Sequence, residues 1–370
     1  MNLTPLIYPM VIGLMLPIIS YAQEKEPSFP PVKTAVIGLV HTHVHGILNP
    51  DNQGGIEIIA IVEPNRSLAE QYSEQYGYSM DMVYPSIEEM LEATKPELVT
   101  AFNTIFGHLE VVEKCAPEGI HIMVEKPLAI SMEHASKMAE LARKYNVHLL
   151  TNYETTWYGS NHYAYEEAVE NGKIGELKKI VVHDGHPGPK EIGCPPEFLE
   201  WLCKPEWNGG GAITDFGCYG ANLSTWLMKG EKPQEVFAVT QHFKPEIYPE
   251  VDDEATIVLT YPKTQTIIQA SWNWPVNRKD MHVYGETGYI QTIDGSRTRV
   301  RWTEKEAEKE INAPARPYPY HNPYTYMAAV VRGEVDAAQS LSSLENNLVV
   351  VEILDAARTS ASTGRRVSLQ

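Results

Sequence analysis

The first part of the chain, from Val32 to about residue 152, alternates short apolar runs with amphipathic stretches. Short apolar runs are typical of buried strands, whereas apolar residues three or four positions apart indicate helices. Strands that alternate with helices predict crossover connections and a parallel sheet, with ligands bound at the carboxyl ends of the strands. We expect strands at 33–39, 56–62, 98–102, 120–124 and 147–150, and helices at 67–76, 86–94, 108–118 and 131–145.

After about residue 153 the pattern changes. A helical segment is followed by a stretch rich in glycine and proline, at 183–211, and then by several extended runs in succession. Consecutive strands of this kind predict an open, mostly antiparallel sheet. The expected elements are a helix at 161–170, strands at 236–243, 255–261, 266–274, 281–284 and 289–293, and closing helices at 324–332 and 344–362. The predicted fold class is α/β, with a doubly wound parallel sheet at 32–152 and an α+β domain with a large open sheet at 153–370.

Residues 6–19 are nearly all apolar, but this run is too short for a membrane-spanning helix and is broken by two prolines. It ends in small residues up to Ala22, which predicts a signal peptide at 1–22 and an exported, periplasmic protein. The basic residues that usually open such a peptide are missing, because none precedes Lys25. A disordered apolar leader or a misassigned start is therefore the alternative interpretation.

Composition narrows the class of partner. The chain has 370 residues with 30 basic and 48 acidic side chains, and therefore a formal net charge of -18. Such a charge repels phosphate backbones and anionic lipids, which argues against nucleic acid or a membrane surface as the main partner. The 20 tyrosines and seven tryptophans suit a polyhydroxylated ligand, because aromatic faces stack on sugar rings. We expect a small-molecule carbohydrate substrate, no nucleic acid, and no membrane span in the mature protein.

The four cysteines permit three pairings, and the sequence does not choose between them. Cys194 and Cys203 share a loop-rich stretch and could form a disulfide in an oxidising compartment. No Cys-x-x-Cys pair is present, so a cysteine-based zinc site is not expected.

The first predicted strand leads into Gly38 and a loop that ends at Gly46. A dinucleotide fingerprint would also place glycine at positions 40 and 43, where this chain has Val40 and His43. The strand before the loop, the helix after it and Glu63 at the end of the second strand nevertheless favour a dinucleotide site. Glu63 would accept a hydrogen bond from a ribose 2′-hydroxyl and repel a 2′-phosphate, so NAD is expected rather than NADP. Its alternative interpretation is a solvated acid at a strand end.

Three histidines alternate along this loop, at His41, His43 and His45. Alternate side chains share a face only on a strand, and here a strand turns into a helix. We therefore expect the imidazoles to diverge and no metal site to form. With two fingerprint glycines missing, the backbone amides of residues 41–44 and the helix N-terminus would hold the pyrophosphate. The side chains of the loop, including Thr42, would line the cofactor or substrate crevice, and local packing and capping are the alternative interpretation.

Two further motifs carry candidate chemistry. The tripeptide Glu-Lys-Pro at 125–127 follows the fifth predicted strand, at the edge where ligands bind. The second motif, at 209–219, opens with three glycines, which allow a ligand to approach the backbone closely, and continues into a predicted helix. Asp215 and Tyr219 lie four residues apart in it and therefore on the same face. Beside Lys126, a carboxylate and a phenol would form a set for proton transfer.

These motifs, together with a turn at 285–288 and the closing helix at 344–364, resemble the glucose–fructose oxidoreductase, inositol dehydrogenase and MocA family (Gfo/Idh/MocA) over about 32–368. The resemblance implies an N-terminal Rossmann domain, a C-terminal domain with a large open sheet, and NAD between them. It also implies hydride transfer between the nicotinamide and a secondary hydroxyl of a sugar, glycoside or cyclitol. Homodimers or homotetramers built through the C-terminal sheet are implied as well.

The same resemblance implies roles for individual residues. Lys126 would lie beside the nicotinamide and the reacting hydroxyl, Asp215 would orient Lys126 or the substrate, and Tyr219 would take the proton. Many members of the family have histidine at this last place. We expect the ammonium of Lys126 and the positive charge of the nicotinamide to lower the pKa of Tyr219. The expected cofactor residues are Gly38, His41, Thr42, His43, Glu63, Asn103, His108, Glu125 and Lys126.

Substrate contacts are expected near the junction of the domains and at the end of the strand that faces the crevice. The candidates are Tyr153, Trp157, His186 and Asn222, with His183 and Asp184 beside them. Trp272 and Trp274 alternate along one predicted strand and are expected on the same side of it, as substrate contacts, sheet packing or a dimer interface. Two other functions stay open. One is a NAD-dependent glycosidase or keto-glycoside pathway enzyme with redox-neutral turnover, and the other is a non-catalytic sensor that binds NAD or a sugar.

Overall fold

The computed structural model describes residues 29–369, and the chain there forms two sheets joined by helices. The first sheet has the order β3-β2-β1-β4-β5-β6, and its neighbouring strands all pair parallel. Because the chain order reverses between β1 and β4, the crevice at their carboxyl ends is a switch point, where such sheets bind ligands. The strands are β1 (Val32–Ile37), β2 (Ile56–Val62), β3 (Val83–Tyr84), β4 (Leu98–Ala101), β5 (His121–Glu125) and β6 (Leu149–Asn152).

Helices connect these strands, as the alternating pattern predicts. Asn65, Ser86 and Ser131 each accept a hydrogen bond from a backbone N–H in the first turn of the helix that follows, which satisfies a donor that the helix itself leaves free. The helices are α1 (Val44–Leu48), α2 (Arg66–Tyr76), α3 (Ile87–Ala93), α4 (His108–Cys115) and α5 (Met132–Tyr145). The pattern does not predict β3, because its two half-buried residues make no apolar run.

The second sheet has the order β14-β13-β12-β11-β7-β10-β9-β8-β15. Among its described strands, β7 and β10 pair parallel, and the other neighbours pair antiparallel. The predicted fold class is confirmed. The strands are β7 (Leu177–Gly185), β8 (Glu235–Gln241), β9 (Glu254–Thr260), β10 (Gln265–Ser271), β11 (Arg278–Gly285), β12 (Tyr289–Thr292), β13 (Arg297–Arg301), β14 (Lys309–Asn312) and β15 (Val367–Ser368).

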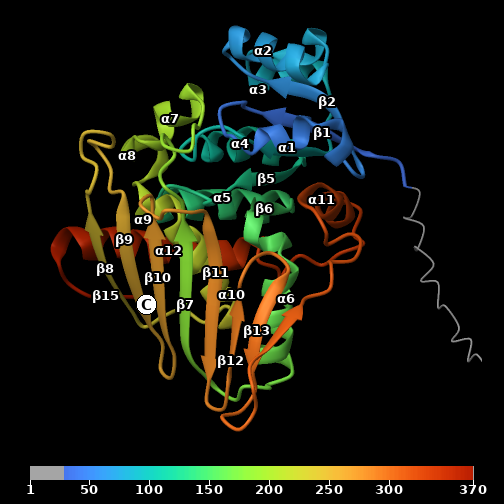
Figure 1. Ribbon diagram of the computed structural model, residues 1–370. Coiled ribbons are helices and arrows are strands. Elements are labelled where there is room, and N and C mark those ends of the chain that lie inside the picture. The colour runs from blue at the N-terminus through green and yellow to red at the C-terminus, as the bar shows by residue number, and fades with distance from the viewer. Residues whose placement is uncertain (1–28, 370) are drawn as a thin grey trace, which may run out of the picture.

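Two helices, α10 (Gly217–Leu227) and α12 (Leu344–Thr363), cover one face of this sheet, behind its strands in Figure 1. The expected helix at 161–170 is α6 (Gly159–Tyr165) continued by a π-helical turn. The glycine- and proline-rich stretch also contains short helices. These are α7 (Pro196–Leu202) and α8 (Pro205–Asn208), and α9 (Ala212–Asp215) follows them.

A segment from near the end of the chain completes the core of the first domain. Tyr324, Met327 and Ala328, on α11 (Pro323–Val331), belong to the same buried cluster as Val36 and Ile61 of the first sheet. Figure 1 shows the orange-red α11 beside the blue and green elements of that domain. In space this segment belongs with the first domain, although the expected division at residue 152 places it in the second.

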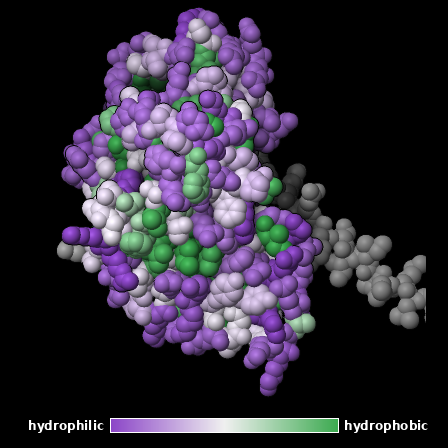
Figure 2. Space-filling model, turned by 60° about the vertical axis from the view of Figure 1, so that its left-hand side comes forward, coloured by the Kyte–Doolittle hydropathy of each residue, from purple (hydrophilic) through white to green (hydrophobic). Residues whose placement is uncertain are grey.

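The other face of the second sheet, away from α10 and α12, is open. On β8, the side chains of Phe237 and Val239 point to this face with exposed fractions of 36% and 53%. The hydropathy-coloured surface in Figure 2 shows hydrophobic residues gathered within a mainly hydrophilic surface. None of the helices in residues 29–369 is both long and apolar enough to cross a membrane.

Two further expectations concern the signal peptide and a disulfide. The expected signal peptide at 1–22 lies outside the described residues. Within residues 29–369 no disulfide is formed, and the free cysteines are Cys115, Cys194, Cys203 and Cys218.

Candidate active site

An ion pair between Lys126 and Asp215 joins the two domains. Lys126 follows β5 and Asp215 ends α9, and the lysine ammonium contacts both the carboxylate and, at 3.2 Å, the main-chain carbonyl oxygen of Asp215. Both residues are buried, with exposed fractions of 6% and 5%. Burial alone would lower the pKa of Lys126 and raise that of Asp215. The attraction between the two charges reverses both shifts, so the pair stays ionised.

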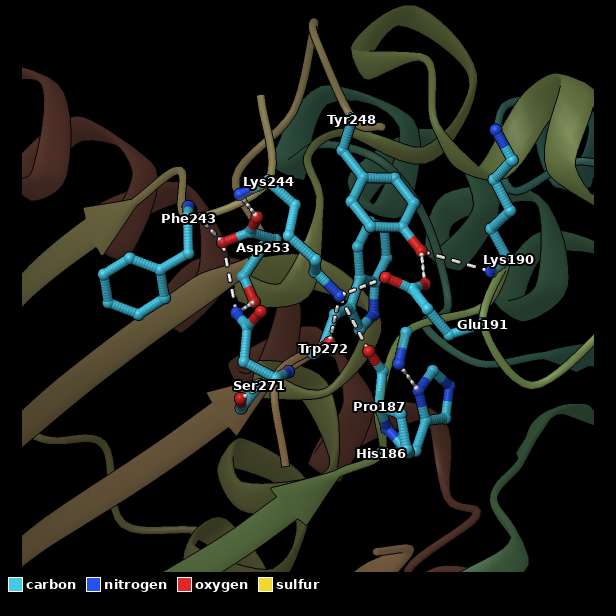
Figure 3. A network of polar contacts seen from close by, with 12 residues as sticks. His186, Pro187, Lys190, Glu191, Phe243, Lys244, Tyr248, Asp253, Ser271 and Trp272 are labelled. Atoms are coloured by element: carbon cyan, nitrogen blue, oxygen red, sulfur yellow. Dashed lines mark hydrogen bonds and ion pairs between the residues drawn. The ribbon is translucent and has the colours of Figure 1, made fainter. Parts of the chain in front are cut away.

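The second oxygen of this carboxylate has its own partner. Trp272, directly after β10, is completely buried and donates from Nε1 to Oδ2 of Asp215 at 2.9 Å. Lys244 donates to the main-chain carbonyl oxygens of Trp272 and Pro187, at 2.7 Å each, and pairs with Glu191 (Figure 3). Three loops therefore meet at one ammonium group, which fixes Trp272 and with it the orientation of Asp215.

Tyr219 lies on α10 with its ring beside two lysines. Nζ of Lys126 is 5.2 Å from the ring centroid, and Nζ of Lys279 is 5.0 Å from it. Tyr153 packs edge-on against the same ring, with 5.4 Å between centroids. Burial, followed by the charge of Glu154, raises the pKa of Tyr219 well above its ordinary value. The ammonium of Lys126 therefore does not bring this pKa down by itself, because burial and the nearby carboxylates outweigh an ammonium that lies over the ring. The contribution of the nicotinamide stays a prediction.

Asp184 brings an unpaired carboxyl group to the same region. It lies near the end of β7, opposite Lys279 of β11, and the alternation of both strands turns these side chains toward α10. Asp184 is completely buried, and neither of its oxygens has a hydrogen-bond partner among the described residues. Burial raises its pKa well above the ordinary value. The ammonium of Lys279 is engaged elsewhere, with Glu154. A buried group without a partner is unusual enough to indicate a ligand contact.

A cavity of about 720 Å³ opens at the carboxyl ends of β1, β2 and β4. Gly38, Glu63 and Asn103 line it, whereas Lys126 lies beyond its lining. Gly38 has a φ of 81°, and a Cβ atom on it would lie 2.8 Å from the backbone of Asn103. Oδ1 of Asn103 is buried and has no partner within residues 29–369. Oδ1 of Asn103 can therefore accept a hydrogen bond from a ligand, and Gly38 lets that ligand approach the backbone closely. Both features fit the adenosine half of a dinucleotide.

Glu63 forms part of this wall. One carboxylate oxygen accepts from the N–H of Leu39 at 2.9 Å, and the other from the N–H of Asn65 at 2.8 Å. Each oxygen keeps a further lone pair for a ribose hydroxyl. The bonds to the backbone fix the carboxylate at the end of β2, and the role at the ribose stays a prediction.

The loop after β1 does not offer the pyrophosphate cradle that the sequence predicts. The N–H of His41 donates to the carbonyl of Phe102 at 2.9 Å, and that of Val44 to the carbonyl of His41 at 3.0 Å. The N–H of His43 donates to Nδ1 of His41 at 3.1 Å. Most amides of residues 41–44 are therefore engaged within the protein, and α1 has only five residues. The expectation is wrong because two backbone carbonyls and the imidazole of His41 already accept these hydrogen bonds.

Two of the three loop histidines converge, against expectation. The rings of His41 and His43 are 4.6 Å apart, and Nδ1 of His43 lies 2.8 Å from Oε2 of Glu125. The other oxygen of Glu125 accepts from Asn152 at 2.7 Å. His45 turns away, with Nδ1 paired to the hydroxyl of a tyrosine on α2. His43 keeps 34% of its side chain exposed and is thus the accessible imidazole at this edge.

Other expected site residues have different outcomes. Tyr153 is in the buried centre, and its hydroxyl has no partner in the described part of the chain. His186 accepts from the N–H of Gly188 at 3.0 Å and packs against Phe216, so it bonds its own turn and also borders the centre. Trp157 donates to Asn152 and opens on a separate cavity of about 330 Å³.

Two expectations about site residues are wrong, and a third stays a prediction. Asn222 donates to the carbonyl of Leu341 at 2.8 Å, so its amide ties α10 to the chain before α12. His108 is completely buried, and its Nδ1 pairs with the carbonyl of Leu128 at 3.1 Å, so it supports the turn after β5. Its Nε2 has no partner among the described residues, and its role at the cofactor stays a prediction.

Trp272 and Trp274 are not on one side of a strand. β10 ends at Ser271, before both of them. Trp272 reaches Asp215, whereas Trp274 contacts His183 on the open face.

Sequence reasoning missed Lys279 and Lys244. Lys279 lies on the same face of β11 as the buried Met281 and Val283, which follow it at alternate positions. A lysine on this otherwise apolar face is the sequence feature that could have indicated its role. Lys244 lies in a loop, and the residues around it in the sequence do not indicate that its ammonium donates hydrogen bonds to two main-chain carbonyl oxygens.

Comparison with known proteins agrees with this geometry. Residues 32–153 match the oxidoreductase family with an NAD-binding Rossmann fold, and residues 162–291 match the GFO/IDH/MocA C-terminal domain. Trans-1,2-dihydrobenzene-1,2-diol dehydrogenase of Xenopus laevis is 26% identical over 271 residues, which cover 72% of this chain and 76% of that protein. D-glucoside 3-dehydrogenase of Escherichia coli is 26% identical over 200 residues, 54% of each.

Solved structures share the fold. Aldose-aldose oxidoreductase from Caulobacter crescentus aligns with a TM-score of 0.78 at 20% identity, over 92% of this chain and 100% of that one. An inositol dehydrogenase homolog from Azotobacter vinelandii, complexed with NAD+, aligns with a TM-score of 0.77 at 15% identity, over 92% and 98%. With both domains matched in order, the chain belongs to the Gfo/Idh/MocA family of NAD-binding sugar and cyclitol oxidoreductases.

Proposed function

We propose that this protein is an exported NAD-dependent dehydrogenase that moves hydride between the nicotinamide and a secondary hydroxyl of a sugar, glycoside or cyclitol. The observation that carries the proposal is the buried set formed by the Lys126–Asp215 ion pair, Tyr219 and the unpaired Asp184. Relatives named for a diol, for myo-inositol and for a glucoside support the substrate class.

The cofactor would lie across the switch point of the first sheet. Gly38, Glu63 and Asn103 would hold its adenosine half, and His43 with Glu125 would face the middle of the molecule. Bound NAD supplies or accepts the hydride. Glu63 favours NAD, because its carboxylate would bond a free ribose hydroxyl and repel a phosphate at the same place.

The protein's own residues would handle the proton. Lys126 stays protonated and donates a hydrogen bond to the reacting oxygen, while Asp215 keeps its ammonium in place. The phenol of Tyr219 gives a proton to that oxygen when a ketone is reduced, and its phenolate takes the proton when the alcohol is oxidised. Its raised pKa makes the neutral phenol the resting form.

The remaining polar groups would recognise the substrate. The carboxyl group of Asp184, whose pKa burial raises, can bond neighbouring sugar hydroxyls, because each of its oxygens lacks a partner among the described residues. The hydroxyl of Tyr153 can do the same. Both groups are completely buried, so a bound substrate would react away from water.

Release of the cofactor is the first test. The purified protein is denatured, and the supernatant is examined for NAD or NADP by mass spectrometry. Native protein is then given a panel of hexoses, glycosides and cyclitols, and the nicotinamide absorbance is followed. Tyr219→Phe should lower turnover at least a hundredfold. The control Tyr289→Phe changes a partly buried tyrosine on β12, away from this centre, and should leave turnover unchanged. Turnover of Tyr219→Phe within a few-fold of wild type would remove Tyr219 from the mechanism.

Export and assembly are parts of the same proposal. The apolar run before Ala22 supports secretion, and N-terminal sequencing of protein recovered from a periplasmic fraction tests it. The exposed Phe237 and Val239 support pairing of two copies through the open sheet. Light scattering should give at least a dimer, and Phe237→Glu/Val239→Glu should give a monomer.

A further inference from the structure

Within residues 29–369, two groups of imidazole and carboxylate side chains are close enough to hold a metal ion. The first, His41 with His43 and Glu125, borders the cofactor crevice, and its polar atoms bond one another and the backbone. The second, His183 with Asp280 and His282, takes no part in the site described above. Its three side chains come from two neighbouring strands of the second sheet.

Strand register brings this second group together. Asp280 of β11 lies directly opposite His183 of β7, and His282 follows two residues later, on the same face. Their neighbours Lys279 and Asp184 point to the other face, toward α10. The group therefore lies on the open face of the sheet, with the candidate active site on the opposite side of the same two strands.

The distances between the polar atoms suit a shared cation. Nδ1 of His183 is 2.9 Å from Oδ1 of Asp280, and Nε2 of His282 is 3.6 Å from the same oxygen. The second distance is too long for a hydrogen bond. Zinc binds nitrogen and oxygen ligands at about 2.0–2.2 Å in a tetrahedral arrangement, which separates the ligand atoms by about 3.3–3.5 Å. All three ligand atoms lie within 4.8 Å of one another.

Surrounding groups hold these side chains in place. The hydroxyl of Tyr284 lies 3.3 Å from Nδ1 of His282, so the other ring nitrogen, Nε2, faces the group. Nε of Arg278 pairs with Oδ2 of Asp280, and its Nη2 reaches Oδ1 at 3.1 Å. Metal-binding histidines and carboxylates are usually oriented in this way by a second hydrogen bond.

Burial and ionisation also suit a metal. His183 and Asp280 are each 8% exposed, while the side chain of His282 keeps 25% of its surface exposed and leaves an approach from solvent. Burial lowers the pKa of His282, so the imidazole is neutral at neutral pH. Burial would raise the pKa of Asp280, but bonds from His183 and Arg278 hold it below the ordinary value. Neutral imidazole and carboxylate are the forms that bind metals.

We propose that His183, Asp280 and His282 form a site for a divalent transition-metal cation of the zinc type. The ligands are Nδ1 of His183, Oδ1 of Asp280 and Nε2 of His282, and water completes a fourth position. Two nitrogen ligands favour zinc over magnesium or calcium, which prefer oxygen alone. Arg278 keeps Oδ2 and releases Oδ1 when the cation enters. The cation ties β7 to β11 directly behind Asp184 and Lys279.

The test uses the full chain, made without an affinity tag and freed of metal with a chelator. Calorimetry with zinc chloride should give one site per chain, and cobalt(II) should give the visible absorption of a tetrahedral complex. Asp280→Asn and His282→Ala should each weaken zinc binding at least a hundredfold. Tyr284→Phe should weaken it about tenfold, because it removes only the group that orients His282.

Two control variants identify the site. His242→Ala changes an exposed histidine outside both groups, and His43→Ala changes the first group. Both should bind zinc as the wild type does. The proposal is overturned if the wild type binds no zinc, or if His43→Ala abolishes binding while His282→Ala does not. Circular dichroism confirms folding of each variant, and His282→Gln replaces His282→Ala if the alanine variant does not fold.

Discussion

The indole nitrogen of Trp272 donates to Oδ2 of Asp215 at 2.9 Å, on the carboxylate oxygen that Lys126 leaves free. Each oxygen of the buried carboxylate therefore has a separate donor. Lys126 is held from the first domain and Trp272 from the second, so the orientation of the carboxylate depends on both.

Trp272→Phe should keep the packing and remove this bond. A hydrogen bond to a charged group contributes about 1.5–3 kcal/mol, so kcat should fall roughly tenfold to a hundredfold as Asp215 and the Lys126 ammonium lose their alignment. Steady-state kinetics on the best substrate measures the effect. Trp274→Phe, beside His183 on the open face, is the matched control and should keep kcat near the wild-type value.

The pH dependence should differ between the two directions of reaction. Oxidation needs the phenolate of Tyr219, whose pKa is raised well above the ordinary value by burial and by Glu154. Below that pKa the phenolate fraction rises tenfold with each pH unit, so kcat/KM for oxidation should climb steadily from pH 6 to about 10. Reduction uses the neutral phenol and should stay flat over the same range. An oxidation profile that levels off near pH 7 would contradict the assignment of Tyr219.

Breaking one side of the buried ion pair should destabilise the protein. Lys126→Met leaves Asp215 charged, buried and without its main partner, which costs about 3–5 kcal/mol of unfolding free energy. Lys126→Met/Asp215→Leu removes both charges and should recover part of that loss. Urea unfolding measures both variants. Equal stability of the single variant and the wild type would show that the pair contributes nothing.

The same pair predicts how stability changes in acid. The pKa of Asp215 is lower in the folded protein than in the unfolded chain. Its contribution is therefore complete above the unfolded pKa of about 3.9 and is lost as the pH falls through the lower folded value. In Lys126→Met/Asp215→Leu, the unfolding free energy should depend less on pH below 4 than it does in the wild type.

Gly38→Ala should weaken both stability and NAD binding. A left-handed backbone costs a residue with a Cβ about 1–2 kcal/mol, and here the new atom would also press on the backbone of Asn103 at 2.8 Å. Gly77→Ala is the matched control, because Gly77 has nearly the same φ with no described atom within 4 Å of the new Cβ. Both variants should lose similar stability from strain. Only Gly38→Ala should raise the Kd for NAD in calorimetry.

Much of the fold follows from the spacing of apolar residues. The expected strand at 56–62 is β2, and the expected helix at 131–145 is α5 with Ser131 as its cap. Both have long or strongly periodic patterns bounded by polar residues. β3 and β15 have two residues each and are formed by pairing with distant strands, so nothing local specifies them.

The site was predictable where residues follow a strand or share a helical turn. Lys126, Asp215 and Tyr219 meet because one lies at the end of β5 and the other two lie on adjoining short helices. The imidazole contacts of the first loop were not predictable, since they depend on which ring turns inward. His183 and Asp280 are 97 residues apart, and only the strand register brings them together.

The position of α11 has a consequence for biosynthesis. The nucleotide-binding domain precedes the second domain along the chain, yet part of its interior is made of residues that a ribosome adds only after position 322. Until then the buried cluster that contains Val36 and Ile61 lacks the part of its cover that α11 provides. A fragment that stops at residue 152 would expose this apolar surface and aggregate. The same fragment mixed with a separate α11 peptide would remain soluble.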